Sequence, residues 1–135
     1  MILDKENMVS NDQVITVTAP STDVLDLQGA GLGDMGPGEP LPLMIQATET
    51  FTAAGAATLV VTLRTVDNAA MASPSIVLTT QAIPVASLIA GYRFPINFIP
   101  HGLERYVDCN YTVATGPMTA GKLVASLVEA YQSNV

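Results

Sequence analysis

The sequence predicts an all-β protein, an antiparallel sandwich or barrel of about eight short strands. Hydrophobic residues make up 49% of the 135 residues, yet aromatic residues make up only 5% and Trp is absent. A core must then be built largely from Val, Leu, Ile, Ala and Thr, a composition that favours strands. Short runs of alternating apolar and polar residues are separated by glycines and prolines, and no convincing long helix is present.

The clearest strand is expected at residues 57–66, where Leu59, Val61 and Leu63 face one side. Residues 105–113 repeat the pattern, with Val107, Cys109, Tyr111 and Val113 on one face and Tyr106, Asp108 and Asn110 on the other. Further strands are expected at residues 14–18, 24–27, 41–49, 75–80 and 92–98.

Two segments could be helical. Pro84 opens a possible helical turn that ends before Gly91. Residues 122–130 could form a helix by propensity, but the preceding glycine turn favours a strand joined as a hairpin to residues 105–113.

The chain is expected to hold one domain at residues 13–135, preceded by an N-terminal arm at residues 1–12. The arm is polar except for Ile2, Leu3 and Met8. Residues 29–40 carry five glycines and two prolines, which predicts a long loop rather than a helix or strand. Loops of this length inside a compact domain often have a function.

Charge and cysteine content exclude several functions. The net charge is −7 with only five Lys and Arg, so no basic surface for nucleic acid or an anionic membrane is expected. A single cysteine, Cys109, cannot form an intrachain disulfide, and its place in a strand indicates a buried, inert thiol. The N-terminus does not resemble a signal peptide, and the apolar stretch at 82–100 is too interrupted to span a membrane. Folding in a cytoplasm is expected.

Residues 115–123, T-G-P-M-T-A-G-K-L, nearly spell a phosphate-binding loop. Leu123 stands where that motif needs a hydroxyl for Mg²⁺, and Pro117 removes one backbone N–H donor. The stretch is therefore predicted to be a plain turn.

No catalytic, cofactor or metal site is predicted. His101 and Glu104 are too few for a zinc site, and the spacing of His101 and Cys109 does not orient them as base and nucleophile. Asp23 and Asp26 lie in no calcium-loop pattern, and the scattered carboxylates give no specific glycosidase pair.

Four stretches resemble the small capsid cement, or decoration, proteins of short-tailed bacteriophages. They are M-I-L-D-K-E-N-M at 1–8, F-T-A-A-G-A-A-T-L at 51–59, L-I-A-G-Y-R-F at 88–94, and E-R-Y at 104–106 followed by N-Y-T-V-A-T-G-P-M-T-A-G-K at 110–122. They occur in order over nearly the whole chain.

This resemblance implies a jelly-roll fold and homodimers on the outside of a capsid, bridging neighbouring capsomers formed by the phage major capsid protein. It implies no enzyme activity and no cofactor. We hypothesise Ile2, Leu3 and Met8 as capsid-contact residues, because apolar residues on a mobile polar arm need a surface to bury them. The alternatives are a carbohydrate- or receptor-binding β-sandwich on a virion or cell surface and, less well supported, a glycosidase or nucleotidase.

Overall fold

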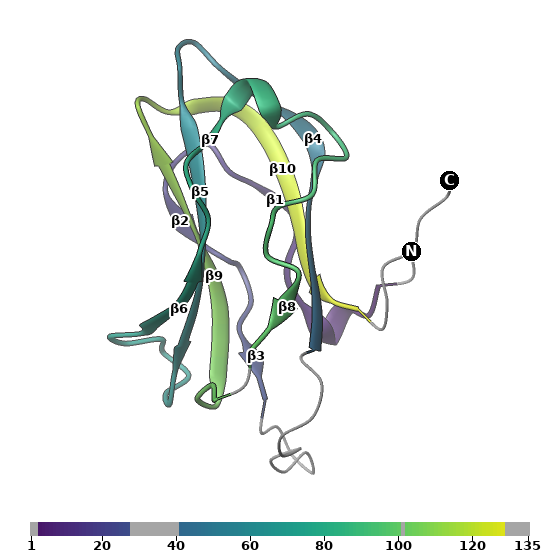
Figure 1. Ribbon diagram of the computed structural model, residues 1–135, viewed down its shortest axis with the longest axis vertical. Coiled ribbons are helices and arrows are strands. Elements are labelled where there is room, and N and C mark those ends of the chain that lie inside the picture. The colour runs from purple at the N-terminus through teal and green to yellow at the C-terminus, as the bar shows by residue number, and fades with distance from the viewer. Residues whose placement is uncertain (1–2, 28–40, 101, 129–135) are drawn as a thin grey trace.

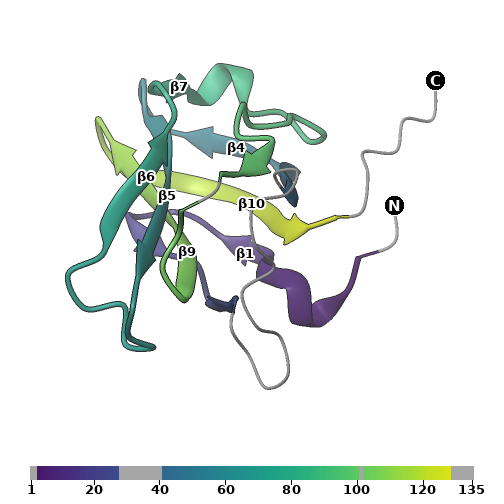
Figure 2. The same cartoon turned by 60° about the horizontal axis from the view of Figure 1, so that its bottom comes forward.

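The computed structural model describes residues 3–27, 41–100 and 102–128, which form two antiparallel sheets packed face to face. Figure 1 shows the sheets as the left and right layers, and Figure 2 gives a second view of the same packing. The described residues include no α-helix, only the 3₁₀ turns η1 (Lys5–Asn7) and η2 (Val85–Ser87). The predicted all-β sandwich is thus confirmed.

One sheet has four strands, in the order β1-β10-β4-β8. Its bounds are β1 Met8–Val14, β10 Met118–Leu127, β4 Leu41–Ala53 and β8 Phe98–Ile99. The second sheet has six strands in the order β2-β9-β5-β6, with β3 also on β9 and β7 also on β5. Its bounds are β2 Ala19–Pro20, β3 Leu25–Asp26, β5 Thr58–Val66, β6 Ser75–Thr79, β7 Ile83–Pro84 and β9 Tyr106–Ala114.

This order is that of a jelly roll. The pairs β2/β3 and β6/β7 each occupy one strand position, which leaves eight positions, four in each sheet. The chain changes sheets at nearly every connection and stays in one sheet only between β5 and β6/β7. The jelly-roll expectation taken from the resemblance is therefore confirmed.

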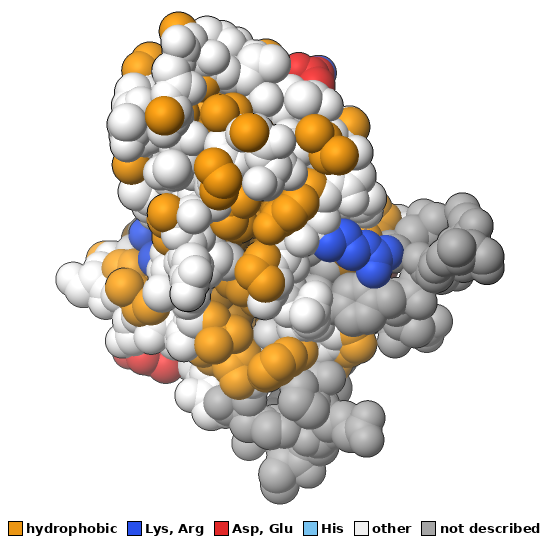
Figure 3. All heavy atoms as spheres, turned by 45° about the horizontal axis from the view of Figure 1, so that its top comes forward, with side chains coloured by type: hydrophobic (Ala, Val, Ile, Leu, Met, Phe, Trp, Pro, Cys, Tyr) orange, Lys and Arg blue, Asp and Glu red, His pale blue; other side chains and the backbone are white. Residues whose placement is uncertain are grey.

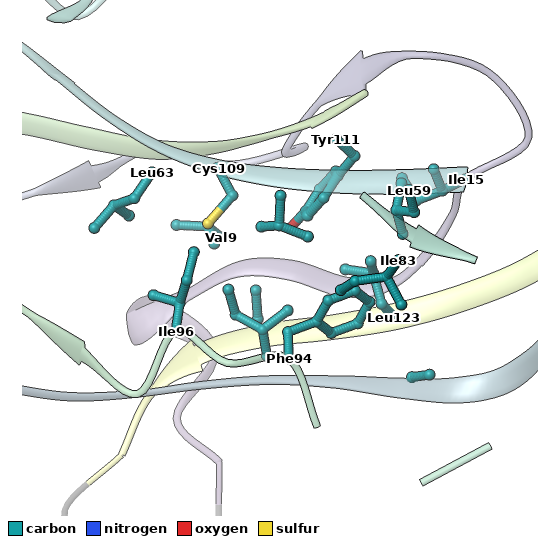
Figure 4. Close-up of a cluster of buried hydrophobic side chains, with 14 of the residues drawn as sticks. Val9, Ile15, Leu59, Leu63, Ile83, Phe94, Ile96, Cys109, Tyr111 and Leu123 are labelled. Atoms are coloured by element: carbon teal, nitrogen blue, oxygen red, sulfur yellow. The ribbon is translucent and has the colours of Figure 1, made fainter. Parts of the chain in front are cut away.

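The strongest sequence patterns predict the core correctly. Leu59, Val61 and Leu63 of β5 and Val107, Cys109 and Tyr111 of β9 are all at most 1% exposed. The two strands pair over their full length, from Thr58↔Ala114 to Val66↔Tyr106. In β4 the predicted face continues past residue 49, so that Leu43, Ile45, Ala47 and Phe51 all point inward. Figure 4 shows side chains of the two sheets meeting between the layers.

Residues 118–127 form β10, so the expectation of a strand rather than a helix over the last segment is confirmed. The predicted hairpin is wrong. β9 and β10 belong to different sheets, and the turn at Thr115 and Gly116 carries the chain across the top of the sandwich (Figure 1). Both residues have positive φ, 63° and 96°. A glycine turn between two alternating runs is typical of hairpins, but it does not reveal whether the runs share a sheet.

The first strand was predicted too late in the chain. It runs over Met8–Val14 instead of residues 14–18, and therefore includes residues expected to belong to the arm. Its pairing with β10 has register shifts after Met8 and after Ser10, and Asp12 has φ 47°. These irregularities remove the alternation of period two by which strands are detected in a sequence.

Residues 92–98 follow the edge of β4 without forming the continuous strand that their alternation predicts. The N–H of Phe94 donates to the carbonyl of Ile45 at 2.9 Å, and that of Leu43 to the carbonyl of Asn97 at 3.0 Å. Pro95 has no N–H to offer to a ladder. Phe94 and Ile96 nevertheless point inward, at 1% and 4% exposure. The helical turn expected after Pro84 is present as η2.

A hydrogen-bonded chain of side chains closes one edge of the sandwich, where β1 of one sheet faces β2 of the other. The Tyr111 hydroxyl, inside the core, is 2.7 Å from the Ser10 hydroxyl, which lies 2.7 Å from Gln13 Oε1. The Gln13 amide donates to the Pro20 carbonyl at 2.8 Å, and its oxygen accepts from the Thr22 N–H at 3.0 Å. We call this set the closed edge.

Gly121 of β10 lies where the Phe51 ring of the neighbouring strand β4 packs directly against the backbone. It lies in β10 at a register shift with β4, and its φ is 142°. A Cβ at this position would lie 2.3 Å from Cδ1 of Phe51, whose ring is buried. The ring therefore occupies the space that any other side chain would need.

We expect Gly121→Ala to lower the free energy of unfolding by roughly 2–5 kcal/mol, because it combines an unfavourable φ with overpacking. Gly116→Ala also has positive φ but meets no atom within 4 Å, and should cost about 1–2 kcal/mol. Gly55→Ala, with open space around it, is the control. Urea denaturation of the three variants measures the order, and equal losses would contradict the role of Phe51.

We expect Ser10→Ala to destabilise the fold by about 1–3 kcal/mol, because it leaves the buried Tyr111 hydroxyl without this partner. Tyr111→Phe should cost about 1 kcal/mol. The double variant should lose less than the sum of the two, as expected for groups in direct contact. Urea denaturation of all four proteins tests this, and strict additivity would show that the hydroxyl pair does not contribute to stability.

Candidate docking surface

The edge of the sandwich opposite the closed edge lacks charge almost entirely. It is formed by β6, β7, η2 and the segment from Leu88 to Ile99, which includes β8. Between Asp67 and Glu104 in the sequence, Arg93 is the only Asp, Glu, Lys or Arg residue. We call this region the uncharged edge. In a chain of net charge −7, such a long interval without acidic residues distinguishes this side from the rest.

A groove with a volume of about 620 Å³ runs along the uncharged edge, between the margins of the two sheets. It is lined by uncharged side chains only: Leu78, Thr79, Thr80, Gln81, Ala82, Ile83, Pro84, Ser87, Tyr92, Pro95, Ile96, Asn97 and Phe98. The volume lies within the range of roughly 300–1,000 Å³ typical of ligand pockets. The groove could therefore hold a small apolar ligand or a few side chains of a partner.

Three exposed hydrophobic side chains lie on the elements of this edge, and one of them, Phe98, lines the groove. Ile76 of β6 is 69% exposed, Ile89 after η2 is 59% exposed, and Phe98 of β8 is 44% exposed. Figure 3 shows hydrophobic side chains gathered in a band down the middle of the visible face, with acidic and basic side chains confined to its margins. Contiguous apolar surface of this kind is typical of interaction sites.

The backbone of this edge is also available for contact. β6 hydrogen-bonds to β5 alone within the described part of the chain. The five residues of β6, S-I-V-L-T, include no charged residue and no proline. Natural edge strands limit unwanted pairing with such residues, with a covering segment or with a bulge, and in β6 the register on β5 shifts between Leu63 and Arg64.

The groove of the uncharged edge offers hydroxyl and amide groups but no carboxylate, imidazole or amine. Among the residues that line the groove, Tyr92 carries the only titratable side chain. No group of three or more His, Cys, Asp or Glu that could hold a metal ion occurs among the described residues. A hydroxyl nucleophile needs an adjacent general base, and the lining residues of the groove include no His, Asp, Glu or Lys.

Two of the residues predicted to contact a capsid, Leu3 and Met8, lie away from the uncharged edge. Met8 is 7% exposed and packs with Met44 and Val124 on the outer face of the four-stranded sheet. Leu3 packs partly against this cluster, together with Val128. Met8 is thus part of the folded domain, whereas Ile2 lies outside the described residues.

The near match to a phosphate-binding loop has a structural explanation. Gly121 accommodates Phe51, and Lys122 Nζ lies 3.1 Å from the Glu49 carboxylate on the neighbouring strand. Gly116 belongs to the turn between the sheets. The segment is followed by a strand and not by the helix N-terminus that binds phosphate.

The two aspartates considered for a calcium loop, Asp23 and Asp26, form ion pairs. The Asp26 carboxylate accepts two hydrogen bonds from Arg105, both 2.8 Å, and Asp23 lies 3.7 Å from Lys5. Asp108, only 2% exposed, accepts two hydrogen bonds from Arg64 of the neighbouring strand, at 2.9 and 2.5 Å. The loop at residues 29–40 and His101 lie outside the described residues.

Cys109 is a buried thiol, as the sequence predicts. It is fully buried, and its sulfur points into the core between the sheets (Figure 4). Burial, with a smaller contribution from the Asp108 charge, raises the pKa of the thiol to about 12. Because the thiolate is the nucleophile, Cys109 is unreactive near neutral pH.

We expect iodoacetamide to leave Cys109 unmodified at pH 8 in the native protein and to modify it fully in concentrated urea. The reason is that both access and thiolate formation require unfolding. Mass spectrometry after timed quenching measures the modified fraction. Modification of the native protein at the rate of a free thiol would show that the core around Cys109 is open.

Sequence reasoning missed the uncharged edge, although one signal was visible. The long interval without charge between Asp67 and Glu104 could have indicated a surface that avoids charge. Its strand patterns, read one at a time, did not show that β6 and the segment ending in β8 lie at the same margin of the sandwich.

No helix in the described part of the chain is long and apolar enough to cross a membrane.

Comparison with known proteins identifies the family. No curated protein matches the sequence. The family model Bbp16 matches residues 9–127, which cover both sheets from β1 to the end of β10. The chain therefore belongs to the Bbp16 family, a family of phage proteins.

Proposed function

We propose that the protein is a capsid cement protein that binds the outer surface of a phage shell and bridges neighbouring capsomers. The observation that carries the proposal is membership of a phage protein family over nearly the whole domain. The sequence strings that resemble the cement proteins of short-tailed phages point to the same role. The proposal includes no catalytic activity, cofactor or nucleic-acid partner.

The surface supports a binding role. Ile76, Ile89 and Phe98 remain exposed at the uncharged edge. Burying them against another protein would release apolar surface from water, which is favourable by about 25 cal/mol per Å². A stable contact buries roughly 1,000 Å² or more in total, so the groove would be only one part of the interface.

The rigidity of the domain suits a bridge. The β4–β10 and β5–β9 ladders run the length of the two sheets, and the closed edge joins the sheets to one another. A shell under pressure from packaged DNA fails where capsomers separate. A rigid protein held on both sides of the boundary adds its binding free energy to the cost of separation. Two linked contacts also bind more tightly than one because of their high effective concentration.

We further propose that the bridging unit is a homodimer, with each protomer gripping one capsomer. The N-terminal segment retains its hypothesised contact role for Ile2 and Leu3. Met8 is already buried in the fold, so a test of this contact must leave β1 intact.

A second candidate is a carbohydrate- or receptor-binding module on a virion or cell surface. The observation in its favour is the groove, which is lined by Tyr92 and Phe98 together with the hydrogen-bonding side chains of Gln81 and Asn97. Sugar sites commonly combine an aromatic face with such polar groups. A glycan array distinguishes the two, since clear hits favour the binding module.

We expect the full-length protein to co-sediment with shells of the cognate major capsid protein at a fixed stoichiometry and to raise their melting temperature. Because binding should be stoichiometric, the bound amount should saturate as protein is added. Density-gradient sedimentation and calorimetry of the shells measure both effects. A variant that lacks residues 1–3 keeps β1 and should bind more weakly if Ile2 and Leu3 are contacts.

Protein that stays at the top of the gradient at both low and physiological salt, with mature shells, would refute the cement proposal. Binding by the truncated variant equal to that of the full chain would refute only the contact role of Ile2 and Leu3.

A further inference from the structure

We propose that two copies of this chain associate through the outer faces of their six-stranded sheets, with a two-fold axis that runs along the strands. By outer face we mean the side chains that β2, β3, β5, β6 and β9 point away from the core. The inference rests on the homodimer of the proposed function and names the surface through which the copies meet. It is carried by the charges of this face, by the order of side chains across it and by its size.

The charges of the outer face cancel. Within the described part of the chain no further layer covers this face, which is the outer side of the left layer in Figure 1. The strands of the sheet carry three charged residues, and each forms an ion pair: Arg64 with Asp108, and Asp26 with Arg105. A net charge of −7 opposes any association of two copies. Two copies therefore meet with least repulsion on a face whose own charges sum to zero.

One row of side chains crosses the outer face. Arg64 of β5 pairs with Asp108 of β9 on one side and with Ile76 of β6 on the other. Val24, just before β3, continues the row beside Asp108, because the pairing of β3 with β9 places it there. The row thus has an acid and a base in the middle and a hydrophobic side chain at each end. Val24 is 37% exposed, and Ile76, where the outer face meets the uncharged edge, is 69% exposed.

This row is complementary to itself under a two-fold rotation. An axis along the strands, between Asp108 and Arg64, reverses the row, so that Asp108 of one protomer faces Arg64 of its partner. The same rotation sets Val24 against the partner's Ile76, and every contact occurs twice. An axis across the strands would instead set Asp108 against Asp108, which their like charges oppose. The expected rotation also keeps the strands of the two sheets aligned, as in sheets that pack face to face.

The polar side chains of the outer face can be buried with few unmet hydrogen bonds. The Thr62 and Thr79 hydroxyls lie 3.2 Å apart and satisfy one another. A guanidinium has several N–H donors and a carboxylate several acceptor sites. The two hydrogen bonds from Arg64 to Asp108 therefore leave capacity for the same pair of the partner. Burial of a polar group is costly chiefly when it leaves the group without a partner, and here each group keeps one.

The size of the outer face meets the need of a specific dimer. β5 and β9 have nine residues each and pair over their full length without a register shift. Nine residues and four strand positions span about 30 Å by about 19 Å, or roughly 1,100 Å² for two protomers, against the minimum of about 1,000 Å² for a specific interface. The four-stranded sheet is less suited, because register shifts interrupt the pairing of β10 with both of its neighbours.

Ile76→Glu tests the contact. The substitution sets a carboxylate against the partner's Val24 at both ends of the interface. We expect it to raise the dissociation constant of the dimer about a hundredfold, tenfold for each of two equivalent contacts. The matched control is Ile89→Glu, because Ile89 is also exposed, 59%, but follows η2, away from the outer face. Sedimentation equilibrium of the free proteins measures the dissociation constants, and equal urea midpoints show that the variants fold.

A second substitution should restore the dimer. Val24→Lys combined with Ile76→Glu sets Lys against Glu at both ends of the interface. We expect this double variant to bind itself about tenfold or more tightly than Ile76→Glu alone, since opposite charges across an interface attract. Within one chain the two sites lie three strand positions apart, about 14 Å, so an ion pair inside the protomer cannot account for the recovery.

The outcomes separate this inference from the proposed function, because they are measured on the free protein without shells. A wild type that stays monomeric at every concentration overturns the inference, as does an Ile76→Glu variant that dimerises like Ile89→Glu. No recovery in the double variant overturns the arrangement of the row, and a dimer lost only in Ile89→Glu places the contact at the uncharged edge instead. If the dimer forms as expected but does not bind shells, the cement proposal is refuted and the contact between outer faces stands.

Discussion

The contact between the Tyr111 and Ser10 hydroxyls determines how the two sheets close on one another. A β-sandwich has two edges, and each must be sealed or left for another use. Here a tyrosine from the centre of the six-stranded sheet reaches across the core to β1, and Gln13 extends the contact to the β2 segment. These polar groups are buried at low cost because each has a partner. The closed edge thus joins the two sheets on this side, and the groove lies at the opposite edge.

At the uncharged edge the connection between the sheets is made by backbone groups around η2: the N–H of Val85 donates to the Ala57 carbonyl, and the Leu88 carbonyl accepts from the N–H of Phe51, both at 2.9 Å. Ion pairs with carboxylates are formed by Lys5, Arg64, Arg105 and Lys122, all of which lie outside the interval between Asp67 and Glu104. The exposed ion pairs add little stability. The remaining acids give the surface a negative field that disfavours non-specific association. The uncharged edge has no acidic residues to repel another protein. This arrangement is expected of a surface used for a specific contact.

The sequence predicted those parts of the fold in which local patterning and tertiary packing agree. β5 and β9 alternate strictly, and their apolar faces are buried as expected. β1 was misplaced because Ser10 is a polar residue buried by a partner about a hundred positions away, and bulges interrupt its register. The sheet-to-sheet turn at Gly116 could not be told from a hairpin, since the same glycine turn serves both. The groove depends on which strands end at a common margin, and this information is absent from any single segment.

An acidic surface keeps copies of the protein apart, whereas an uncharged edge allows apolar contact with a partner. Placing the two on different sides of the domain prevents one from opposing the other. Long-range repulsion between copies falls off over about 10 Å at moderate salt, so it controls encounter but not close contact. Burial of Ile76, Ile89 and Phe98 acts only at contact and depends little on salt. A partner segment without charge thus meets little electrostatic barrier and gains the full apolar burial, whereas an acidic partner is repelled before it reaches the groove. The distribution of charge along this chain therefore favours an uncharged partner at this edge over an acidic one.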